Sequence, residues 1–181
     1  MRPALTFTRN ILAFFGFASI AAGVFASVFF LGGWYSVAST AWEPEIVRET
    51  LIFTRENSVR RHAVDFPPAE FDNAAGLRAG ARAYLDRGCV NCHGAPGAEW
   101  ARFSEGLRPD PPDLKEVAKE RSPAEIFWVV KNGINMTGMP SFGDAPDPEL
   151  WSIAALVKKL PDLSDEDFKS LAPSPPAAPN P

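Results

Sequence analysis

The sequence predicts an all-α protein in which one N-terminal transmembrane helix precedes a small helical domain. No charged residue occurs between Ile11 and Trp42, and a helix that spans a bilayer needs about 20 apolar residues. In residues 73–163, apolar side chains recur with helical spacing and no segment reads convincingly as a strand. The net charge of −4 argues against a nucleic-acid partner, because such proteins present a basic face.

Residues 1–41 are predicted to form a membrane anchor that is not cleaved. The apolar run is longer than the roughly 7–15 residues of a signal peptide, although a poor match to a cleavage site at Val37 to Ser39 leaves cleavage as the alternative. Arg2 and Arg9 precede the run and Glu43 follows it, which places the N-terminus in the cytoplasm. We therefore expect a single-pass protein of the inner (cytoplasmic) membrane with its remaining chain in the periplasm.

Small residues recur every four positions within this anchor, at Ser19, Gly23 and Ser27. Such a stripe permits close packing of membrane helices, so the anchor could dock into a larger complex. The same spacing also arises by chance in spans rich in Ala and Gly.

Residues 42–72 are expected to be an extracytoplasmic spacer and hinge. Apolar residues every three to four positions between Trp42 and Asp65 predict an amphipathic helix, lying on the domain or on the membrane surface. His62 in this charged run is expected to be a solvated surface residue. The prolines of "DFPPAEFDN" then break the helix. At the other end, residues 166–181 form a predicted tail that is rich in proline from Ala172 onward.

The domain between these flanks, residues 73–165, is expected to contain three main helices. The first covers about 74–87. The second begins with Ser122 as N-cap and Glu125 in a capping box, and it stops at Gly133. The third begins with Asp147 as its cap and Pro148 as its first residue, and it runs to Leu160.

The chain's two cysteines lie in "RGCVNCHGAPG", and they carry the first chemical signal. A disulfide between Cys89 and Cys92 would close a very short loop and leave His93 without a role. A structural zinc ion needs four ligands, and the chain has only these cysteines and two histidines. A redox C-x-x-C belongs beside a β-α-β pattern, which is missing. C-x-x-C-H indicates instead the covalent attachment of one haem c, with His93 as an iron ligand.

A second iron ligand is expected in "KNGINMTGMPSFGD". A methionine opposite a histidine raises the reduction potential of a haem, which suits a carrier of single electrons. Met139 is the stronger candidate, because Gly138 lets the chain turn before it and Pro140 stiffens the chain after it. Phe142 can pack beside the ring. Met136 is the alternative ligand, and it is otherwise expected in the core or at the rim.

Residues 76–163 resemble a class I cytochrome c. The resemblance rests on C-x-x-C-H, on the spacing of Gly80 and Tyr84, on Met139 followed by Pro140, and on "DPPDL". It implies that the first and last helices of the domain cross, and that the carbonyl of Pro112 accepts a hydrogen bond from His93. It also implies a haem pocket that includes Pro112 and Leu114. With its anchor, the whole chain is similar to membrane-anchored monohaem cytochromes of proteobacteria.

Three functions follow from this resemblance. The first is a tethered electron carrier, not itself an enzyme, between a quinol-oxidising complex or dehydrogenase and a terminal oxidase or reductase in a respiratory or photosynthetic chain. The second is a fixed cytochrome subunit of a membrane-bound or periplasmic oxidoreductase. The third is a haem sensor or peroxidase with a labile sixth ligand. For recognition of partners, the available cations are Lys115, Lys119, Arg121 and Lys131.

Overall fold

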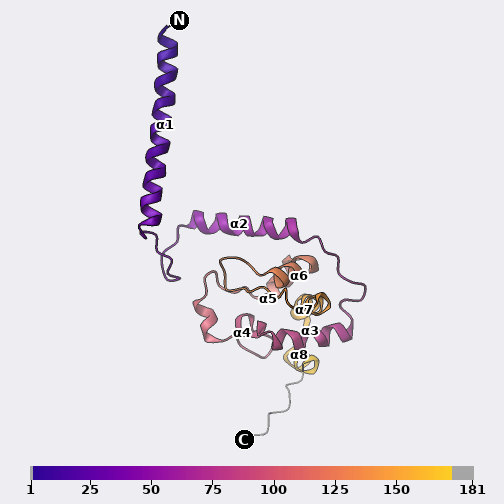
Figure 1. Ribbon diagram of the computed structural model, residues 1–181. Helices are drawn as coiled ribbons and strands as arrows, with labels where there is room; N and C mark the ends of the chain where they lie inside the picture. The colour runs from indigo at the N-terminus through magenta and orange to yellow at the C-terminus, as the bar shows by residue number, and fades with distance from the viewer. Residues whose placement is uncertain (1, 173–181) are drawn as a thin grey trace. The chain divides into compact units, whose positions relative to one another are not determined.

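The computed structural model describes residues 2–172 and divides the chain into two compact units, Met1–Trp42 and Glu43–Pro181 (Figure 1). The described residues are helical, with a single isolated bridge between Ala95 and Ala98 and no strand. The expected all-α class is therefore confirmed.

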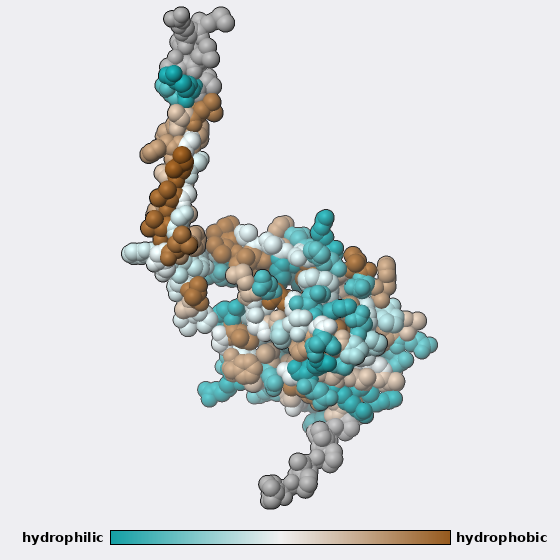
Figure 2. Space-filling view, in the orientation of Figure 1, coloured by the Kyte–Doolittle hydropathy of each residue, from teal (hydrophilic) through white to brown (hydrophobic). Residues whose placement is uncertain are grey.

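The first unit contains one long helix, α1 (Arg2–Leu31). Its segment Arg9–Leu31 is long and apolar enough to cross a membrane, and no part of that segment is buried in the protein. Figure 2 shows this apolar surface as a nearly continuous hydrophobic column. Ser27, one of the three small residues of the anchor, donates its hydroxyl to the carbonyl of Gly23 at 2.8 Å, so its polar group is satisfied within the helix.

The core of the second unit is built by α3 (Ala74–Asp86), α6 (Pro123–Asn132) and α7 (Asp147–Lys159). α3 packs mainly against α7, and the backbones come close at Gly80, where a Cβ atom would collide with the carbonyl of Ser152. This is the crossing of first and last helices that the resemblance implied. The apolar side of α7 is almost completely buried there, including Leu150, Ile153 and Leu156.

Local sequence signals explain how these helices begin. Ser122 accepts a hydrogen bond from the Glu125 backbone N–H and Glu125 reaches back to Ser122, which is the expected capping box of α6. The start of α7 differs from the expectation, because Pro146 occupies the N-cap position and Asp147 is the first helical residue. The Asp147 carboxylate instead accepts from Lys131 Nζ at 2.7 Å, which ties α7 to the end of α6.

Short helices complete the domain. They are α4 (Cys89–His93), α5 (Leu114–Glu120), α8 (Asp165–Leu171) and the 3₁₀ turns η1 (Arg102–Gly106) and η2 (Leu160–Asp162). α8 lies at the start of the segment that the sequence indicated as a tail, and its Phe168 is buried with an edge-on contact to Tyr84. The packed chain thus continues past residue 165. Most of the proline-rich stretch, residues 173–181, lies outside the described part.

The helix expected in the spacer is α2 (Glu45–His62), and it belongs to the second unit. It packs against α6, on the side of the domain away from α3 and α8 (Figure 1). Val59 is its one buried residue. His62 is exposed, as expected, and its ring stacks on Trp128 with 5.9 Å between centroids.

Candidate functional site

The two cysteines lie on α4, a five-residue helix between two glycines. Gly88 and Gly94 both have positive φ angles, of 73° and 63°, a conformation that glycine adopts without steric cost. These glycines set the sharp bends that isolate α4 as a single turn, so that Cys89 and Cys92 project from the same short segment as His93. Both thiols are free, and burial raises the pKa of Cys89 to about 11.

His93 is oriented by a backbone contact from a distant loop. Its Nδ1 atom lies 3.0 Å from the carbonyl oxygen of Pro112. A carbonyl can only accept, so Nδ1 carries the proton and Nε2 keeps its lone pair for a metal ion. Burial lowers the pKa of His93 and outweighs the opposing effect of the Pro112 hydrogen bond, which favours the neutral imidazole that a metal requires.

A buried tyrosine holds the residue that follows the histidine. Tyr84 on α3 donates its hydroxyl to the carbonyl of Gly94 at 2.6 Å, and its side chain is 1% exposed. Burial raises the pKa of Tyr84 far above its ordinary value, so the hydroxyl remains a donor at all moderate pH values. The sequence marked Tyr84 only by its spacing from Gly80. Its hydrogen bond to Gly94, which fixes the chain where α4 ends, can be seen only in the folded chain.

A cavity of about 640 Å³ opens beside His93. Four residues that the sequence indicated for the haem site line this cavity: Cys92, His93, Pro112 and Leu114. Its volume is typical of sites for cofactors, which are about 300–1,000 Å³. An oriented imidazole, a free thiol and a cavity of this size together fit a covalently bound haem.

Met139 lies on the loop between α6 and α7, and it is not among the residues that line this cavity. It is partly buried and packs against the core, as does Phe142. Three hydrogen bonds shape the loop: Met139 N to Thr137 Oγ1, Thr137 Oγ1 to the Ile134 carbonyl, and Ile134 N to the Met139 carbonyl. The cavity therefore gathers Cys92, His93, Pro112 and Leu114, while Met139, Phe142 and Cys89 do not line it and pack against the hydrophobic core.

Met136, the alternative ligand, does not line the cavity. It is 85% exposed and has a φ angle of 58°, in the left-handed region that few residues other than glycine adopt. The bend at Met136 turns the chain so that Met139 comes back toward Gly133. A Cβ atom on Gly133 would touch the backbone at Pro140, so the loop also depends on this glycine.

Two further residues of the cavity were not singled out from the sequence, Trp100 and Arg108. Both lie in the stretch between His93 and Pro112, where no periodicity or motif marks them. Arg108 is half exposed and paired with Asp110. A guanidinium and an indole N–H are donors suited to the carboxylates of a haem. The only signal in the sequence is their position between two segments that the fold brings together.

Most of the basic residues considered for recognition are engaged within the domain. Arg121 pairs with Glu56 at 2.6 Å, Lys131 with Asp147 at 2.7 Å and Lys119 with Glu116 at 2.7 Å. Lys115 instead lines the cavity, together with four acidic side chains: Glu99, Glu105, Asp110 and Asp113. The charged residues that line the cavity are thus four carboxylates and two cations, Lys115 and Arg108.

Comparison with known proteins agrees with this geometry. Residues 75–157 match the family model described as "Cytochrome C oxidase, cbb3-type, subunit III". Neither the curated proteins nor the solved structures include a significant match. The matched range begins in α3, contains C-x-x-C-H, Pro112 and Met139, and ends in α7. The chain therefore carries a class I c-type cytochrome domain, a haem c module of electron transport, behind one candidate membrane-spanning helix.

Proposed function

We propose that the protein is a membrane-tethered carrier of single electrons with one haem c, ligated by His93 and Met139. The observation that carries the proposal is the hydrogen bond from His93 Nδ1 to the Pro112 carbonyl. It fixes the ring beside a cavity and leaves Nε2 available, which is the arrangement of a ligating histidine. When bound, the haem supplies reversible one-electron chemistry at its iron.

Each residue of the site then has a separate task. Cys89 and Cys92 would hold the haem through thioether bonds, and His93 and Met139 would hold its iron. Leu114 and Phe142 keep water from the ring, which favours the less charged reduced centre. If both His93 and Met139 hold the iron, neither oxygen nor peroxide would have a place to bind, which would argue against a sensor or a peroxidase.

The tether defines where the carrier works. With α1 in the inner membrane and the cytochrome domain in the periplasm, diffusion is confined to the membrane surface, which raises the effective concentration near membrane-bound partners. The partners are a quinol-oxidising complex or dehydrogenase as donor, and a terminal oxidase or reductase as acceptor. The candidate span Arg9–Leu31 supports this arrangement.

A fixed subunit of an oxidoreductase is the second candidate. It is favoured by the family match, whose description is that of a subunit of cbb3-type cytochrome c oxidase, and by the small residues Ser19, Gly23 and Ser27. Extraction of the native membrane in mild detergent followed by gel filtration separates the two. A stoichiometric partner that stays with the haem-stained chain would favour the subunit over the carrier.

Ligation is tested with the variants Met139→Ala and Met136→Ala, each purified with its covalent haem. We expect Met139→Ala to lose the methionine-to-iron absorption band and to bind carbon monoxide when reduced. Met136→Ala is the matched control and should keep the band and exclude carbon monoxide, because its side chain is exposed. Loss of the band in Met136→Ala alone would overturn the assignment of Met139.

A further inference from the structure

We propose that Arg87 is a positioning residue that ties the loop of Met139 to the segment of the two cysteines, and that this tie limits how readily an external ligand replaces Met139. The inference rests on the proposed ligation by Met139. It adds to that ligation a residue that touches neither the haem nor the iron and still determines how firmly the sixth position is closed.

Arg87 directly follows α3 and lies two positions before Cys89. Its guanidinium donates through Nε to Glu149 at 2.8 Å and through Nη1 to Asp144 at 3.0 Å. A planar guanidinium presents several N–H groups in a fixed fork, so one arginine can hold two carboxylates at once. Glu149 lies in the first turn of α7 and Asp144 in the loop after Met139, so Arg87 joins three separate segments of the domain.

The loop of Met139 is fastened on its other side to α6. Asp144 lies five residues after Met139, and the stretch between them is held by Ser141. Ser141 Oγ donates to the Lys131 carbonyl at 2.7 Å and accepts from the Gly143 N–H at 3.2 Å. These bonds define the shape of the loop and fix it to the end of α6. The contact with Arg87 fixes the same loop to the segment that carries the cysteines.

The charges explain why loss of Arg87 would move the loop. Asp144 and Glu149 accept from one guanidinium, so their carboxylates lie near each other. An isolated ion pair at a surface contributes little, but removal of this cation replaces two attractions by one repulsion between like charges. The side chain of Asp144 is 76% exposed and lies on a loop, whereas that of Glu149 is 33% exposed and lies on a packed helix. The loop is therefore the part that gives way.

The consequence concerns ligand exchange at the iron. An external ligand such as imidazole binds only when Met139 has left, so its apparent affinity is its intrinsic affinity multiplied by the fraction of molecules with an open loop. A residue that holds the loop in place lowers this fraction. Arg87 therefore favours electron transfer over ligand binding without a change in the ligands themselves.

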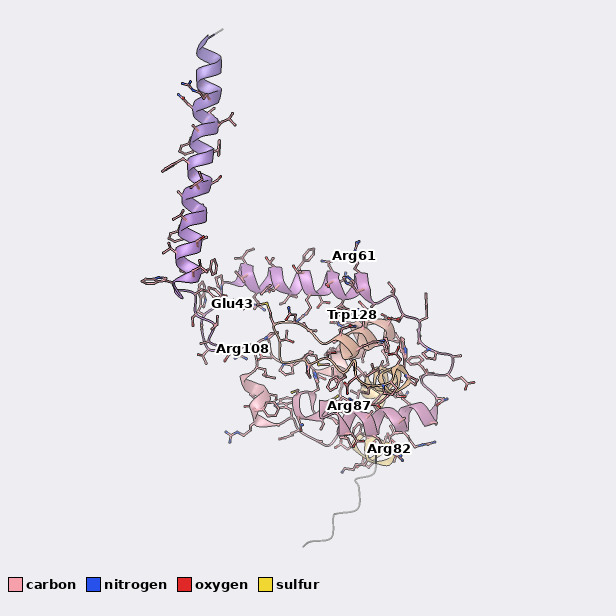
Figure 3. All side chains as sticks on the ribbon, in the orientation of Figure 1. Glu43, Arg61, Arg82, Arg87, Arg108 and Trp128 are labelled. Carbon is pink, nitrogen blue, oxygen red and sulfur yellow. The ribbon has the colours of Figure 1, made fainter. Side chains whose placement is uncertain are left out.

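The test titrates the oxidised, full-length, haem-loaded chain in mild detergent with imidazole and follows the loss of the methionine-to-iron band. We expect Arg87→Gln to bind imidazole about two- to fivefold more tightly than the wild type, in keeping with the modest strength of exposed ion pairs. The matched control is Arg82→Gln, which removes the same charge from an exposed position of α3 and should leave the affinity unchanged (Figure 3).

Two further measurements assign the effect to the ion pair. The double variant Arg87→Gln/Asp144→Asn should bind imidazole no more tightly than Arg87→Gln, because the two residues act through one contact. Raising the ionic strength from about 0.02 M to about 0.5 M should narrow the difference between the wild type and Arg87→Gln, since salt screens both the attraction and the repulsion. A defect in apolar packing would not respond to salt in this way.

Equal imidazole affinity of the wild type and Arg87→Gln, with the band present in both, would overturn this inference and leave the proposed ligation intact. Absence of the band in the wild type would overturn ligation by Met139 and the inference with it. Hydrogen exchange on the same samples separates positioning from general stability. Faster exchange confined to the 133–146 peptide in Arg87→Gln supports the inference, whereas an equal loss of protection in α3 and α7 would show that Arg87 only stabilises the fold.

Discussion

α2 and α3 are attached to the same domain by different means. α3 crosses α7 with its backbone in direct contact at Gly80, and it buries Ala81, Ala83 and Tyr84. α2 buries one residue, Val59, and adds the Glu56–Arg121 ion pair and the stacking of His62 on Trp128. α3 is held by a continuous buried contact with α7. α2 is held by three separate interactions, and each of them can be removed by a single substitution.

The largest expected effect is at the α3–α7 crossing. Gly80→Val would place side-chain atoms on the Ser152 carbonyl, and neither backbone can move without opening the core. We expect the domain to lose at least about 3 kcal/mol of stability, the upper range of overpacking. Denaturant unfolding followed by the haem absorbance measures this. Arg82→Val, on the exposed side of the same helix, is the control and should change stability little.

Val59→Ala should release α2 while leaving the core intact. Removing two buried methyl groups costs about 1.6 kcal/mol at about 0.8 kcal/mol per buried carbon. Hydrogen exchange measured by mass spectrometry should show faster exchange in the 45–62 peptide and unchanged protection in α3 and α7. Equal loss of protection in α3 would show that the two attachments are not independent.

The Glu56–Arg121 pair makes the attachment of α2 sensitive to acid. Burial alone would raise the pKa of Glu56, but the Arg121 charge and the hydrogen bonds from Arg55 and Arg121 outweigh it and lower the pKa. A lowered carboxyl pKa stabilises the fold above the ordinary value of about 4.3, and this stability is lost as the pH falls through the folded value. The protection of the 45–62 peptide, which is its exchange rate compared with the intrinsic rate at the same pH, should therefore fall below about pH 4.

Glu56→Gln is the matched variant for this pH dependence. It should weaken the attachment by about 1–3 kcal/mol at neutral pH, the cost of an unpaired partly buried partner. Its exchange should then vary less with pH than that of the wild type. A wild-type acid response that persists unchanged in Glu56→Gln would assign the effect to another carboxyl group.

The smallest effect is expected at His62. Its ring stacks on Trp128 but is exposed, so His62→Ala should cost no more than about 1 kcal/mol. His62→Phe keeps a planar ring and should restore the contact. Both variants are measured by the same exchange of the 45–62 peptide.

Local signals allowed much of this fold to be predicted. The capping box at Ser122, the stop at Gly133 and the long uncharged run each act within a few residues, and the structure has the corresponding elements. α5 and α8 were not foreseen, and the sequence left open whether α2 lies on the domain or on the membrane surface, because Phe168 and Val59 are buried only by distant partners. For the site, C-x-x-C-H and "DPPDL" identified residues that meet at the cavity. Trp100 and Arg108 lie in a loop without pattern, and only the folded chain brings them there.

One short helix, α5, connects the loop that contacts His93 to the residue that pairs with α2. α5 starts immediately after Asp113, beside the Pro112 carbonyl that holds His93, and it ends at Arg121, the partner of Glu56. Lys158 of α7 donates to the carbonyls of Ala118 and Arg121, which clamps the far end of α5 to the core. The seven residues of α5 therefore connect the loop that orients His93, the proposed iron ligand, to the ion pair that holds α2 on the domain.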